Sequence, residues 1–359
     1  MSEYCVIMAG GTGAKFWPVS RADMPKQFLD LTTKGRSFLR ITYDRMRGIF
    51  PAERILVVTH HSYADIVSQQ LGELPAQNLL SEPYSRNTAP ATVFAAYTLL
   101  LRDPEAVFVT VPADLTLTDD AAFRESVSQA LSFAASGGAL ISLGAVPQRA
   151  VCSCGYIQMA SPAKGKPVKV KTFTQEPPQA LAERFVASGE FLQNTGIQAW
   201  KASVLRTELE KHAPEVTDLW KGWKTALPGS GRATFLEKAY AGCPRISIGD
   251  ALLERSNNAW VLPCNFGWTD INDWETLYRF LPSRDRRENA VFSRGKVLIE
   301  GSRRNIVLGS GKDKLIAVHG LDDFVIVDAG DVLMICPRKE AELSDFIARL
   351  GLPEFEKYR

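Results

Sequence analysis

The sequence predicts an α/β protein with a mostly parallel, mixed sheet that carries helices on both faces, followed by a small β module. Over residues 1–150, short β-branched runs alternate with longer amphipathic segments, as in a parallel sheet covered by helices. A segment rich in proline and charged residues then follows at 281–290, which is typical of a boundary. Beyond it, short apolar runs recur between Gly, Asp and Ser turns, which favours an all-β module and leaves a short β-helix open.

The first four strands are expected to be short, apolar and buried. They are predicted at residues 4–8, 54–59, 106–111 and 139–143. Helices are predicted between them, because Ser37 and Asn87 are placed to cap two of these segments. Asp119 and Asp120 favour the N-terminus of a third helix, which should reach about residue 135.

The pattern becomes less regular after residue 156. Strands are predicted at 168–173 and 197–200, a helix at 179–188, and several helices within 201–241. In the β module, the runs KVLIE, NIVLG, KLIAVHG, FVIVD and VLMIC read as strands, and residues 340–350 as a closing helix. We therefore expect a large α/β domain at 1–281 and a β-rich domain with the closing helix at 290–359.

The composition excludes several classes of protein. The chain has 359 residues, of which 45% are hydrophobic and 23% charged, so it can bury a substantial core. With 42 basic and 40 acidic residues, it gives no electrostatic reason to expect nucleic acid or membrane partners. No signal peptide or membrane span is recognisable, so a cytoplasmic protein is expected; a homodimer stays open. The six cysteines form no C-x-x-C pair and are expected to be reduced and structural.

A glycine-rich segment, MAGGTGAKFWPVSR (8–21), follows the first predicted strand directly. Gly10, Gly11 and Gly13 have no Cβ, so their amides can approach an anionic ligand such as a phosphate. A dinucleotide-binding fingerprint is excluded because Phe16 stands where the third glycine belongs, and no G-K-S/T follows for a Walker A loop. A plain tight turn is the alternative interpretation.

Two lysines near this segment strengthen the functional interpretation. Lys15 and Lys26 place positive charge beside the glycines, after the carboxyl end of a strand, where open α/β sheets bind ligands. The alternative is that both are ordinary surface lysines.

Five segments in chain order resemble the mannose-1-phosphate guanylyltransferases of the nucleotide-diphospho-sugar transferase superfamily. They are the glycine-rich segment with PKQFL, then EPYSRNTAPA (82–91), VPAD (111–114), QNTG (193–196) and FGWTDINDW (266–274). The resemblance implies that GTP and a sugar 1-phosphate, most simply mannose 1-phosphate, react with the help of Mg²⁺ to give GDP-sugar and pyrophosphate.

The resemblance also assigns roles to residues. Lys15, at a position usually held by arginine, and Lys26 match the catalytic cations, and Asp114 and Asp270 match the metal-binding carboxylates. Glu82 can accept from both N1–H and the 2-amino group of guanine. The full set expected to bind the nucleotide is Ala9, Gly10, Gly11, Thr12, Gly13, Glu82, Arg86, Asn87 and Thr88. Each carboxylate also has a purely structural interpretation, as a cap, a brace or a surface acid.

The sugar half departs from the resemblance. Gln175 and Glu176 stand where the family has a glutamate and a phosphate-binding lysine, whereas Gly155 and Asn194 match family sugar contacts. We expect Lys171 to compensate, because residues two apart on a strand share a face, which would place Lys171 beside Phe173 and Lys169. A different hexose or heptose 1-phosphate, or a non-catalytic protein that binds nucleotide sugars, are therefore the alternatives.

Overall fold

The structure is a computed structural model, which describes residues 2–11, 16–32, 34–163, 165–281, 284–339 and 343–358. The chain divides into two compact units, of which unit 1 comprises 1–10 and 39–268 and unit 2 comprises 11–38 and 269–359. The predicted domains, 1–281 and 290–359, differ from these units. The difference arises because Phe16, Trp17 and Leu31 pack into the apolar core of unit 2 rather than that of unit 1.

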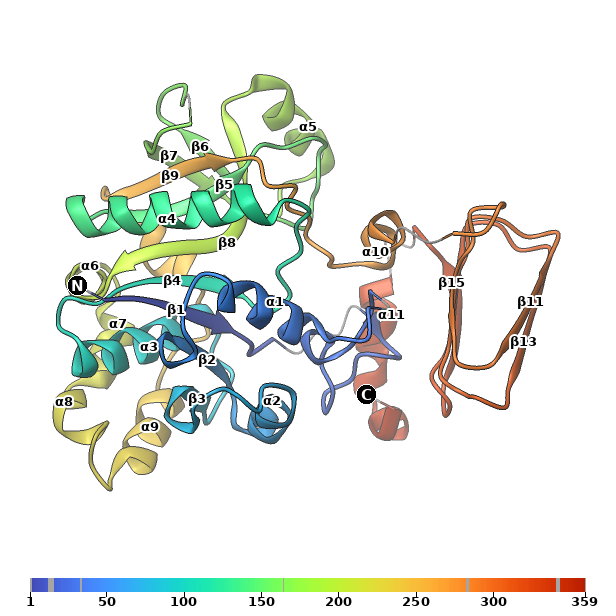
Figure 1. Cartoon of the computed structure of the whole chain (residues 1–359), viewed down its shortest axis with the longest axis horizontal. Coiled ribbons are helices and arrows are strands. Elements are labelled where there is room, and N and C mark those ends of the chain that lie inside the picture. The colour runs from blue at the N-terminus through green and yellow to red at the C-terminus, as the bar shows by residue number, and fades with distance from the viewer. Residues whose placement is uncertain are drawn as a thin grey trace. The chain divides into compact units, whose positions relative to one another are not determined.

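Unit 1 is built on a mixed sheet, as predicted (Figure 1). In the described residues nine strands pair in the order β3-β2-β1-β4-β8-β5-β9-β7-β6. Their bounds are β1 (Glu3–Met8), β2 (Ile55–His60), β3 (Leu79–Glu82), β4 (Val107–Pro112), β5 (Leu140–Ala145), β6 (Tyr156–Met159), β7 (Val168–Thr174), β8 (Phe191–Lys201) and β9 (Ala259–Cys264). The pairs among β1 to β4 and the pair β5–β9 are parallel. β8 runs antiparallel to β4, β5 and β6, and β7 runs antiparallel to β6 and β9, so the sheet is mixed but not mostly parallel. The carboxyl ends of β1, β2, β3 and β4 therefore meet at one edge.

Helices cover this sheet. They are α1 (Phe38–Arg47), α2 (Ala64–Gln70), α3 (Thr88–Arg102), α4 (Asp120–Gly137), α5 (Gln179–Ser188), α6 (Ala202–His212), α7 (Pro214–Thr217), α8 (Trp223–Ala226), α9 (Arg232–Ala241) and the π-helix η7 (Gly249–Leu253). Asn87 and Asp119 cap α3 and α4 as predicted, each accepting a backbone N–H at its helix start. Helix α4 lies along β8 and β5 (Figure 1), whereas α3 packs on β1, β2 and β3.

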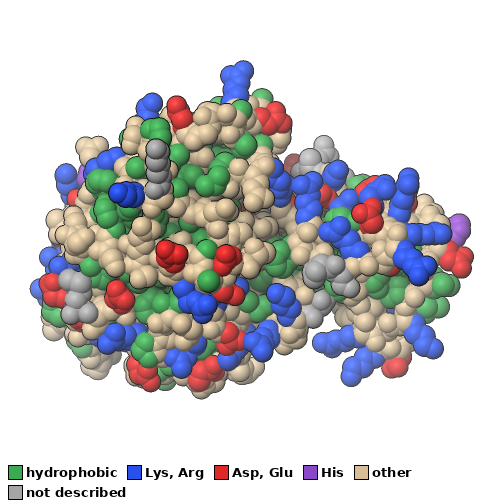
Figure 2. Space-filling view, turned by 45° about the horizontal axis from the view of Figure 1, so that its top comes forward, with side chains coloured by type: hydrophobic (Ala, Val, Ile, Leu, Met, Phe, Trp, Pro, Cys, Tyr) green, Lys and Arg blue, Asp and Glu red, His purple; other side chains and the backbone are tan. Residues whose placement is uncertain are grey.

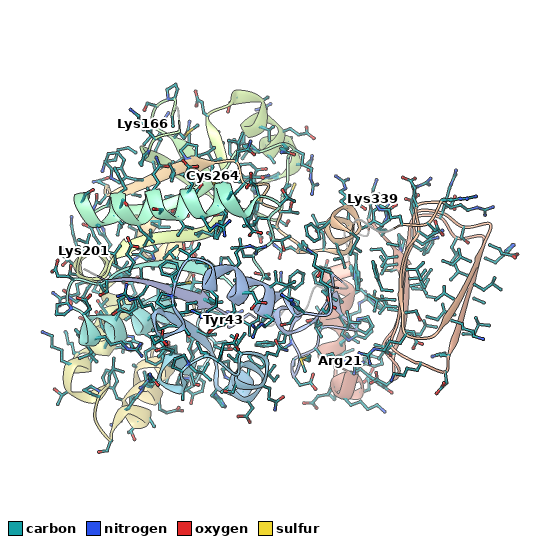
Figure 3. The ribbon with its side chains drawn as sticks, in the orientation of Figure 1. Arg21, Tyr43, Lys166, Lys201, Cys264 and Lys339 are labelled. Carbon is teal, nitrogen blue, oxygen red and sulfur yellow. The ribbon has the colours of Figure 1, made fainter. Side chains whose placement is uncertain are left out.

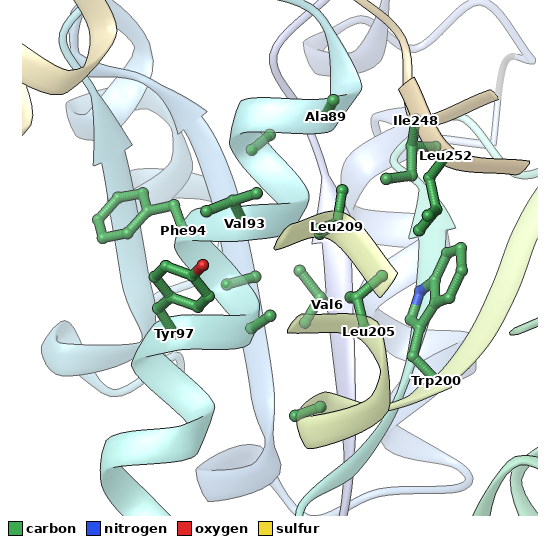
Figure 4. Close-up of a cluster of buried hydrophobic side chains, with 14 of the residues drawn as sticks. Val6, Ala89, Val93, Phe94, Tyr97, Trp200, Leu205, Leu209, Ile248 and Leu252 are labelled. Atoms are coloured by element: carbon green, nitrogen blue, oxygen red, sulfur yellow. The ribbon is translucent and has the colours of Figure 1, made fainter. Parts of the chain in front are cut away.

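The main core of unit 1 lies between α3, α6 and the sheet. Figure 4 shows Val93, Phe94 and Tyr97 of α3 together with Leu205 and Leu209 of α6 in this core. Because almost every residue of α3 from Ala89 to Leu99 is buried, the position of this helix is fixed by packing. Its N-terminus is therefore held firmly at the edge of the sheet.

Unit 2 contains the predicted β module. Parallel pairs join Ala290 to Ile306 and Ile306 to Val325, so successive strands stack as coils of a short β-helix. The described elements are η2 (Lys26–Phe28), α10 (Trp274–Phe280), β10 (Ala290–Ser293), β11 (Lys296–Glu300), β12 (Ile306–Gly309), β13 (Leu315–His319), β14 (Phe324–Asp328), β15 (Leu333–Pro337), α11 (Leu343–Ala348), η8 (Arg349–Gly351) and η9 (Pro353–Tyr358). Helix α11 falls inside the closing helix predicted at 340–350.

Side-chain ladders hold the coils together. Asn305 is fully buried and donates to the side chain of Asn289 at 3.0 Å and to the carbonyl of Leu321 at 2.7 Å. Figure 2 shows Lys and Arg side chains over the C-terminal strands. Within the module, Arg303 forms an ion pair with Asp322 at 2.8 Å. Part of the positive charge of the β module is therefore balanced by a carboxylate of the same module.

The cysteines behave as structural residues where their contacts are known. Cys264, at the end of β9 (Figure 3), donates from its thiol to the carbonyl of Gly144 at 3.2 Å. Burial raises the pKa of the Cys264 and Cys5 thiols well above their ordinary range, so neither is reactive as a thiolate. Among the described residues, no helix combines the length and the apolar character that crossing a bilayer requires.

Candidate functional site

A pocket of about 690 Å³ opens in unit 1, large enough for a small-molecule ligand. It lies over the carboxyl-terminal parts of the central strands and beside the start of α3. The residues that line it are Met8, Asn87, Thr88, Thr92, Thr110, Pro112, Gln175, Glu176, Asn194, Gly196, Gln198, Ser247, Ile248, Gly249, Asp250 and Leu253. Segments far apart in the sequence thus meet here, including three predicted to bind nucleotide or sugar.

The β8 side of the pocket is shaped by glycine and amide groups. Gly196 has a φ of 72°, and a Cβ at this position would lie 3.1 Å from the ring of Pro112. The Oδ1 atom of Asn194 accepts from the backbone N–H of Gly196 at 3.1 Å, which leaves the Asn194 amide nitrogen for other acceptors. The predicted sugar contact Asn194 therefore lines the pocket.

Gln175 occupies the space between two glycines. A Cβ on Gly155 would lie 2.7 Å from Oε1 of Gln175, and one on Gly249 would lie 3.4 Å from its Nε2. Gln175 and Gly155, both predicted to contact the sugar, are thus neighbours. Glu176 follows with a φ of 40°, a left-handed conformation that strains a residue with a side chain.

The pocket carries negative rather than positive charge. Glu176 and Asp250 line it, and Asp250 accepts a hydrogen bond from Ser247 at 2.8 Å. Among the described residues, no lysine or arginine lines this pocket. A phosphate group would therefore find no cation among the described residues that line this pocket, whereas sugar hydroxyls would find both donors and acceptors.

Lys171 does not share a face with Phe173, and that prediction is wrong. Residues 158–159 of β6 pair with Thr172 and Val170, so Lys171 is the extra residue of a β-bulge. The bulge reverses the alternation, because Phe173 and Val170 both pack in the main core while Lys171 is exposed.

Lys169, the other lysine of this strand, is also engaged elsewhere. Its amino group donates to the carbonyl of Asn257 at 2.8 Å and lies 4.4 Å from the ring centre of Trp260. The compensation expected from this strand therefore has no geometric support.

The start of α3 links the pocket to η7. Thr88 accepts on its hydroxyl from the backbone N–H of Ile248 at 2.9 Å, and Asn87 has a φ of 71°. Arg86 points away from this edge, because its guanidinium donates to the carbonyls of Tyr240 and Ala241 at 3.1 and 3.2 Å. Of the three residues predicted here, Asn87 and Thr88 line the pocket, whereas Arg86 holds the end of α9.

Glu82 ends β3 and is 4% exposed. A Cβ on Gly10 would lie 3.2 Å from its Oε2, so any larger residue here would press on the carboxylate. Within the described residues, Oε1 of Glu82 has no hydrogen-bond partner. Burial raises the pKa of this carboxyl to about 7, and a hydrogen bond with Tyr240 opposes the rise. Two predicted residues, Gly10 and Glu82, are thus neighbours.

This pKa predicts a pH-dependent stability. The folded chain keeps the Glu82 proton up to about pH 7, whereas the unfolded chain releases it near 4.5. The stabilising contribution is complete below pH 4.5 and is lost as the pH rises through 7. Relative to Glu82→Gln, the free energy of unfolding of the wild type should fall by on the order of 3 kcal/mol across this window. Urea unfolding at several pH values measures this free energy. The control Glu53→Gln, at an exposed residue, should give a curve of free energy against pH that is parallel to that of the wild type. A parallel curve for Glu82→Gln as well would contradict the assignment.

The remaining glycine-loop residues are only partly described. The backbone of Ala9 is engaged, since its N–H donates to Val58 and its carbonyl accepts from Thr59. The carbonyl of Gly11 accepts from the Gln27 side chain at 2.6 Å, within unit 2. The predicted residues Thr12, Gly13 and Lys15 lie outside the described residues.

The two predicted metal ligands lie in different units. Asp114 follows β4 in unit 1 and is partly buried, and the hydroxyl of Thr116 donates to its carbonyl at 3.2 Å. Asp270 lies in unit 2, where its carboxylate accepts from the side chain of Asn272. Among the described residues, no cluster of three or more His, Cys, Asp or Glu side chains could hold a metal.

Lys26 joins the same segment of unit 2. Its amino group donates to Oδ1 of Asn272 at 2.8 Å and to the carbonyl of Ile271 at 3.1 Å. The PKQFL and FGWTDINDW segments, about 240 residues apart, therefore meet through Lys26 and Asn272. The pairing is held by the buried side chains of Phe16 and Trp274, whose ring centres are 5.1 Å apart.

Sequence reasoning missed several pocket residues. Thr110 and Gln198 are buried polar residues on strands that otherwise read as apolar. A polar side chain inside such a run was the available signal, because buried amides and hydroxyls need partners. Tyr240, which contacts the Glu82 carboxyl, carried no comparable signal.

Comparisons with known proteins agree with these features. The pattern of the nucleotidyl transferase family matches residues 4–284, and that of the MannoseP isomerase/GMP-like beta-helix domain matches residues 295–343. The chain is 32% identical to the mannose-1-phosphate guanylyltransferase of Escherichia coli K12, over 94% of this chain and 71% of that protein. It is also 32% identical to the alginate biosynthesis protein AlgA of Pseudomonas aeruginosa, over 94% of this chain and 69% of that protein.

A solved structure is similar over almost the whole chain. It is described as mannose-1-phosphate geranyltransferase from Thermus thermophilus, with a TM-score of 0.85 and 28% identity, covering 98% of this chain and 100% of that one. The chain therefore belongs to the nucleotidyl transferase family, in the group of the mannose-1-phosphate guanylyltransferases.

Proposed function

We propose that this chain transfers the guanylyl group of GTP to mannose 1-phosphate. A phosphate oxygen of the sugar 1-phosphate attacks the α-phosphorus of GTP, and the bond to the bridging α–β oxygen breaks. Pyrophosphate leaves with that electron pair, and GDP-mannose is formed. The observation that carries the proposal is the unit 1 pocket, where Asn87 and Thr88 from the nucleotide segment meet Gln175 and Asn194 from the sugar segments.

The sugar would be held by uncharged and acidic groups. Asn194 offers amide donors, and Asp250 and Glu176 offer acceptors for hydroxyl hydrogens. Gln175 can do both. This composition suits the polar, uncharged ring of a hexose better than its phosphate, for which like charge at a few ångströms is unfavourable.

The nucleotide would be recognised by the loop and strand ends around Glu82. Gly10 and Gly11 offer backbone amides without Cβ atoms, as a phosphate site requires. Oε1 of Glu82, which is buried and has no hydrogen-bond partner among the described residues, supports its assignment to the guanine edge. Two N–H donors of guanine would favour the ionised carboxylate over the protonated form that burial favours in the free protein. Lys26 is assigned as a point charge for the phosphates.

A divalent ion, which we infer to be Mg²⁺, completes the proposal. Asp114 and Asp270 are carboxylates partly open to solvent, which are the hard oxygen donors that Mg²⁺ takes together with water and substrate phosphates. When bound, the ion would neutralise charge on the reacting phosphates.

Pyrophosphate release tests the proposed function. GTP and Mg²⁺ are incubated with the chain and with mannose, glucose, galactose or heptose 1-phosphate in turn. We expect the largest kcat/KM with mannose 1-phosphate. A preference for another sugar would favour a different hexose or heptose 1-phosphate as the acceptor. Gln175 and Glu176 are the reason for this alternative, because they stand where the family has a glutamate and a lysine. Binding of GDP-mannose without any turnover would favour a non-catalytic protein.

Base selection gives a sharper test of Glu82. In Glu82→Gln the amide NH₂ replaces one acceptor, so the 2-amino group of guanine faces a donor. KM should therefore rise roughly 5- to 150-fold for GTP, the effect of an unpaired buried donor, and much less for ITP, which lacks that amino group. Kinetics with both nucleotides measure the ratio. Equal losses for GTP and ITP would show that Glu82 does not contact this edge.

A further inference from the structure

Gln198 places an amide at the floor of the unit 1 pocket. It lies on β8, lines the pocket and is 5% exposed. Its neighbours on the strand, Ile197 and Ala199, are fully buried and apolar. Burying an amide among such residues costs free energy unless its oxygen and its nitrogen both find partners. The fate of these two atoms therefore decides what Gln198 can do.

The amide oxygen is held by the protein. The hydroxyl of Thr110 donates to Oε1 of Gln198 at 3.0 Å, and Nε1–H of Trp200 donates to the Thr110 hydroxyl at 3.3 Å. Because an indole N–H can only donate, the Thr110 oxygen accepts from Trp200 and its own hydrogen points to Gln198. Oε1 of Gln198 is the nearer acceptor of this hydrogen, and the backbone carbonyl of Gln198 lies at 3.3 Å. Trp200 is fully buried in the main core with Ile248 and Leu252 (Figure 4), so this chain of hydrogen bonds starts from a fixed group.

The amide nitrogen remains for a ligand. Among the described residues, Nε2 of Gln198 has no acceptor, although the side chain is almost fully buried. This nitrogen is not fully enclosed by protein, and Gln198 lines the pocket, so a ligand in the pocket can reach it. Asn194, four residues earlier on β8, repeats the arrangement, with its oxygen held by Gly196 and its nitrogen left over. The floor of the pocket thus presents amide donors.

We propose that Gln198 is a specificity-determining residue of the acceptor site, whose Nε2 donates to a hydroxyl oxygen of the sugar ring. This inference rests on the proposed function, because it takes the pocket as the site of the sugar 1-phosphate. A ring hydroxyl is favoured over a phosphate because Glu176 and Asp250 line the same pocket and would repel an anion. Thr110 is then a positioning residue, since it fixes which end of the amide faces the ligand.

The test replaces the donor and varies the sugar. Gln198→Met keeps the length of the side chain and removes both N–H groups, so KM for mannose 1-phosphate should rise roughly 10-fold, the effect of one lost hydrogen bond in a buried site. KM for GTP should stay unchanged, and the exposed Gln69→Met should behave as the wild type. Four monodeoxy analogues of mannose 1-phosphate, lacking the hydroxyl at C2, C3, C4 or C6, then locate the partner. The effect of Gln198→Met should vanish for one analogue and persist for the others.

Two further variants separate recognition from folding. Gln198→Glu keeps the shape and replaces the donor by an acceptor, so it should impair sugar binding more than Gln198→Met. Thr110→Val should raise KM for the same sugars as Gln198→Met, but by a smaller factor. Thr110→Ser, which keeps the hydroxyl, should have the KM values of the wild type. A loss that is equal for every analogue, or equal for GTP and sugar, would overturn the assignment.

Calorimetric binding of mannose 1-phosphate and its deoxy analogues repeats the comparison without turnover. A wild type that binds the sugar 1-phosphate but releases no pyrophosphate would refute the proposed function, while the dissociation constants would still decide the role of Gln198. A wild type that binds none of these sugars would overturn the inference as well.

Discussion

Replacing Asp114 or Asp270 with asparagine should lower kcat for pyrophosphate release by more than about 10³-fold. Loss of one preorganised electrostatic stabiliser usually lowers kcat by about 10² to 10³. Loss of a divalent ion that neutralises several phosphate oxygens should exceed this, and an amide is a poor replacement for a carboxylate in a site that selects hard anionic oxygens. KM for GTP should also rise, because the nucleotide itself supplies part of the coordination.

The controls separate loss of metal from loss of fold. Asp65→Asn, an exposed change on α2, should leave kcat unchanged. Thermal unfolding of Asp114→Asn and Asp270→Asn without substrate should match the wild type. EDTA should abolish pyrophosphate release by the wild type, and excess Mg²⁺ should restore it. Turnover that survives EDTA would show that no metal is required, and turnover that survives one substitution would remove that residue from the proposed metal site.

Four strands of unit 1, β1, β2, β4 and β5, were predictable because they are buried on both faces, whereas β3, β6 and β9 were not predicted. β4 and β5 are mostly apolar runs, each interrupted by one hydroxyl residue, Thr110 or Ser142, and such runs indicate buried strands. The helices α3 and α4 were equally clear, since Asn87 and Asp119 mark their first residues. The coils of unit 2 repeat short apolar strands between turn residues, and this repetition alone favours a β-rich module.

β8 shows where hydropathy fails. Only its end, 197–200, is predicted from the sequence, although the strand runs from Phe191 to Lys201. Its first half contains Gln193 and Thr195, which are buried but polar. Each finds a partner far along the chain, because Gln193 donates to Arg149 and Thr195 to Leu143. Such long-range partners make a polar residue compatible with a core, and no local pattern reveals them.

Two other features depended on contacts that the sequence does not display. The bulge at Lys171 inverts the faces of β7, and a one-residue change of alternation cannot be read from the strand alone. Segment 16–31 leaves the sheet domain because Phe16 and Trp274 pack together. The same packing carries Lys26 to Asn272 in unit 2. Motif residues were therefore predictable by type, whereas their partners were not.

Lys26→Met should lower kcat by about 10²- to 10³-fold, the usual effect of removing one charge that stabilises a phosphoryl-type transition state. Methionine keeps most of the aliphatic stem, so the packing of η2 should persist. The ammonium group is held by Asn272 and the carbonyl of Ile271, which positions it as a point charge. Lys26→Arg should recover only part of the rate, because the larger planar guanidinium cannot take the same position between these acceptors.

Asn272→Ala tests how far this positioning matters. It removes the acceptor 2.8 Å from the Lys26 amino group while leaving the charge in place, so kcat should fall by a smaller factor than in Lys26→Met. The double variant should lose little more than Lys26→Met alone, because the two residues act through one contact. The matched control is Lys34→Ala, which removes an exposed lysine of the same segment and should leave kcat unchanged. If Lys26→Met and Lys34→Ala have the same kcat, Lys26 only braces the loop that contains Asp270. The positive charge that stabilises the reacting phosphates would then come from other groups.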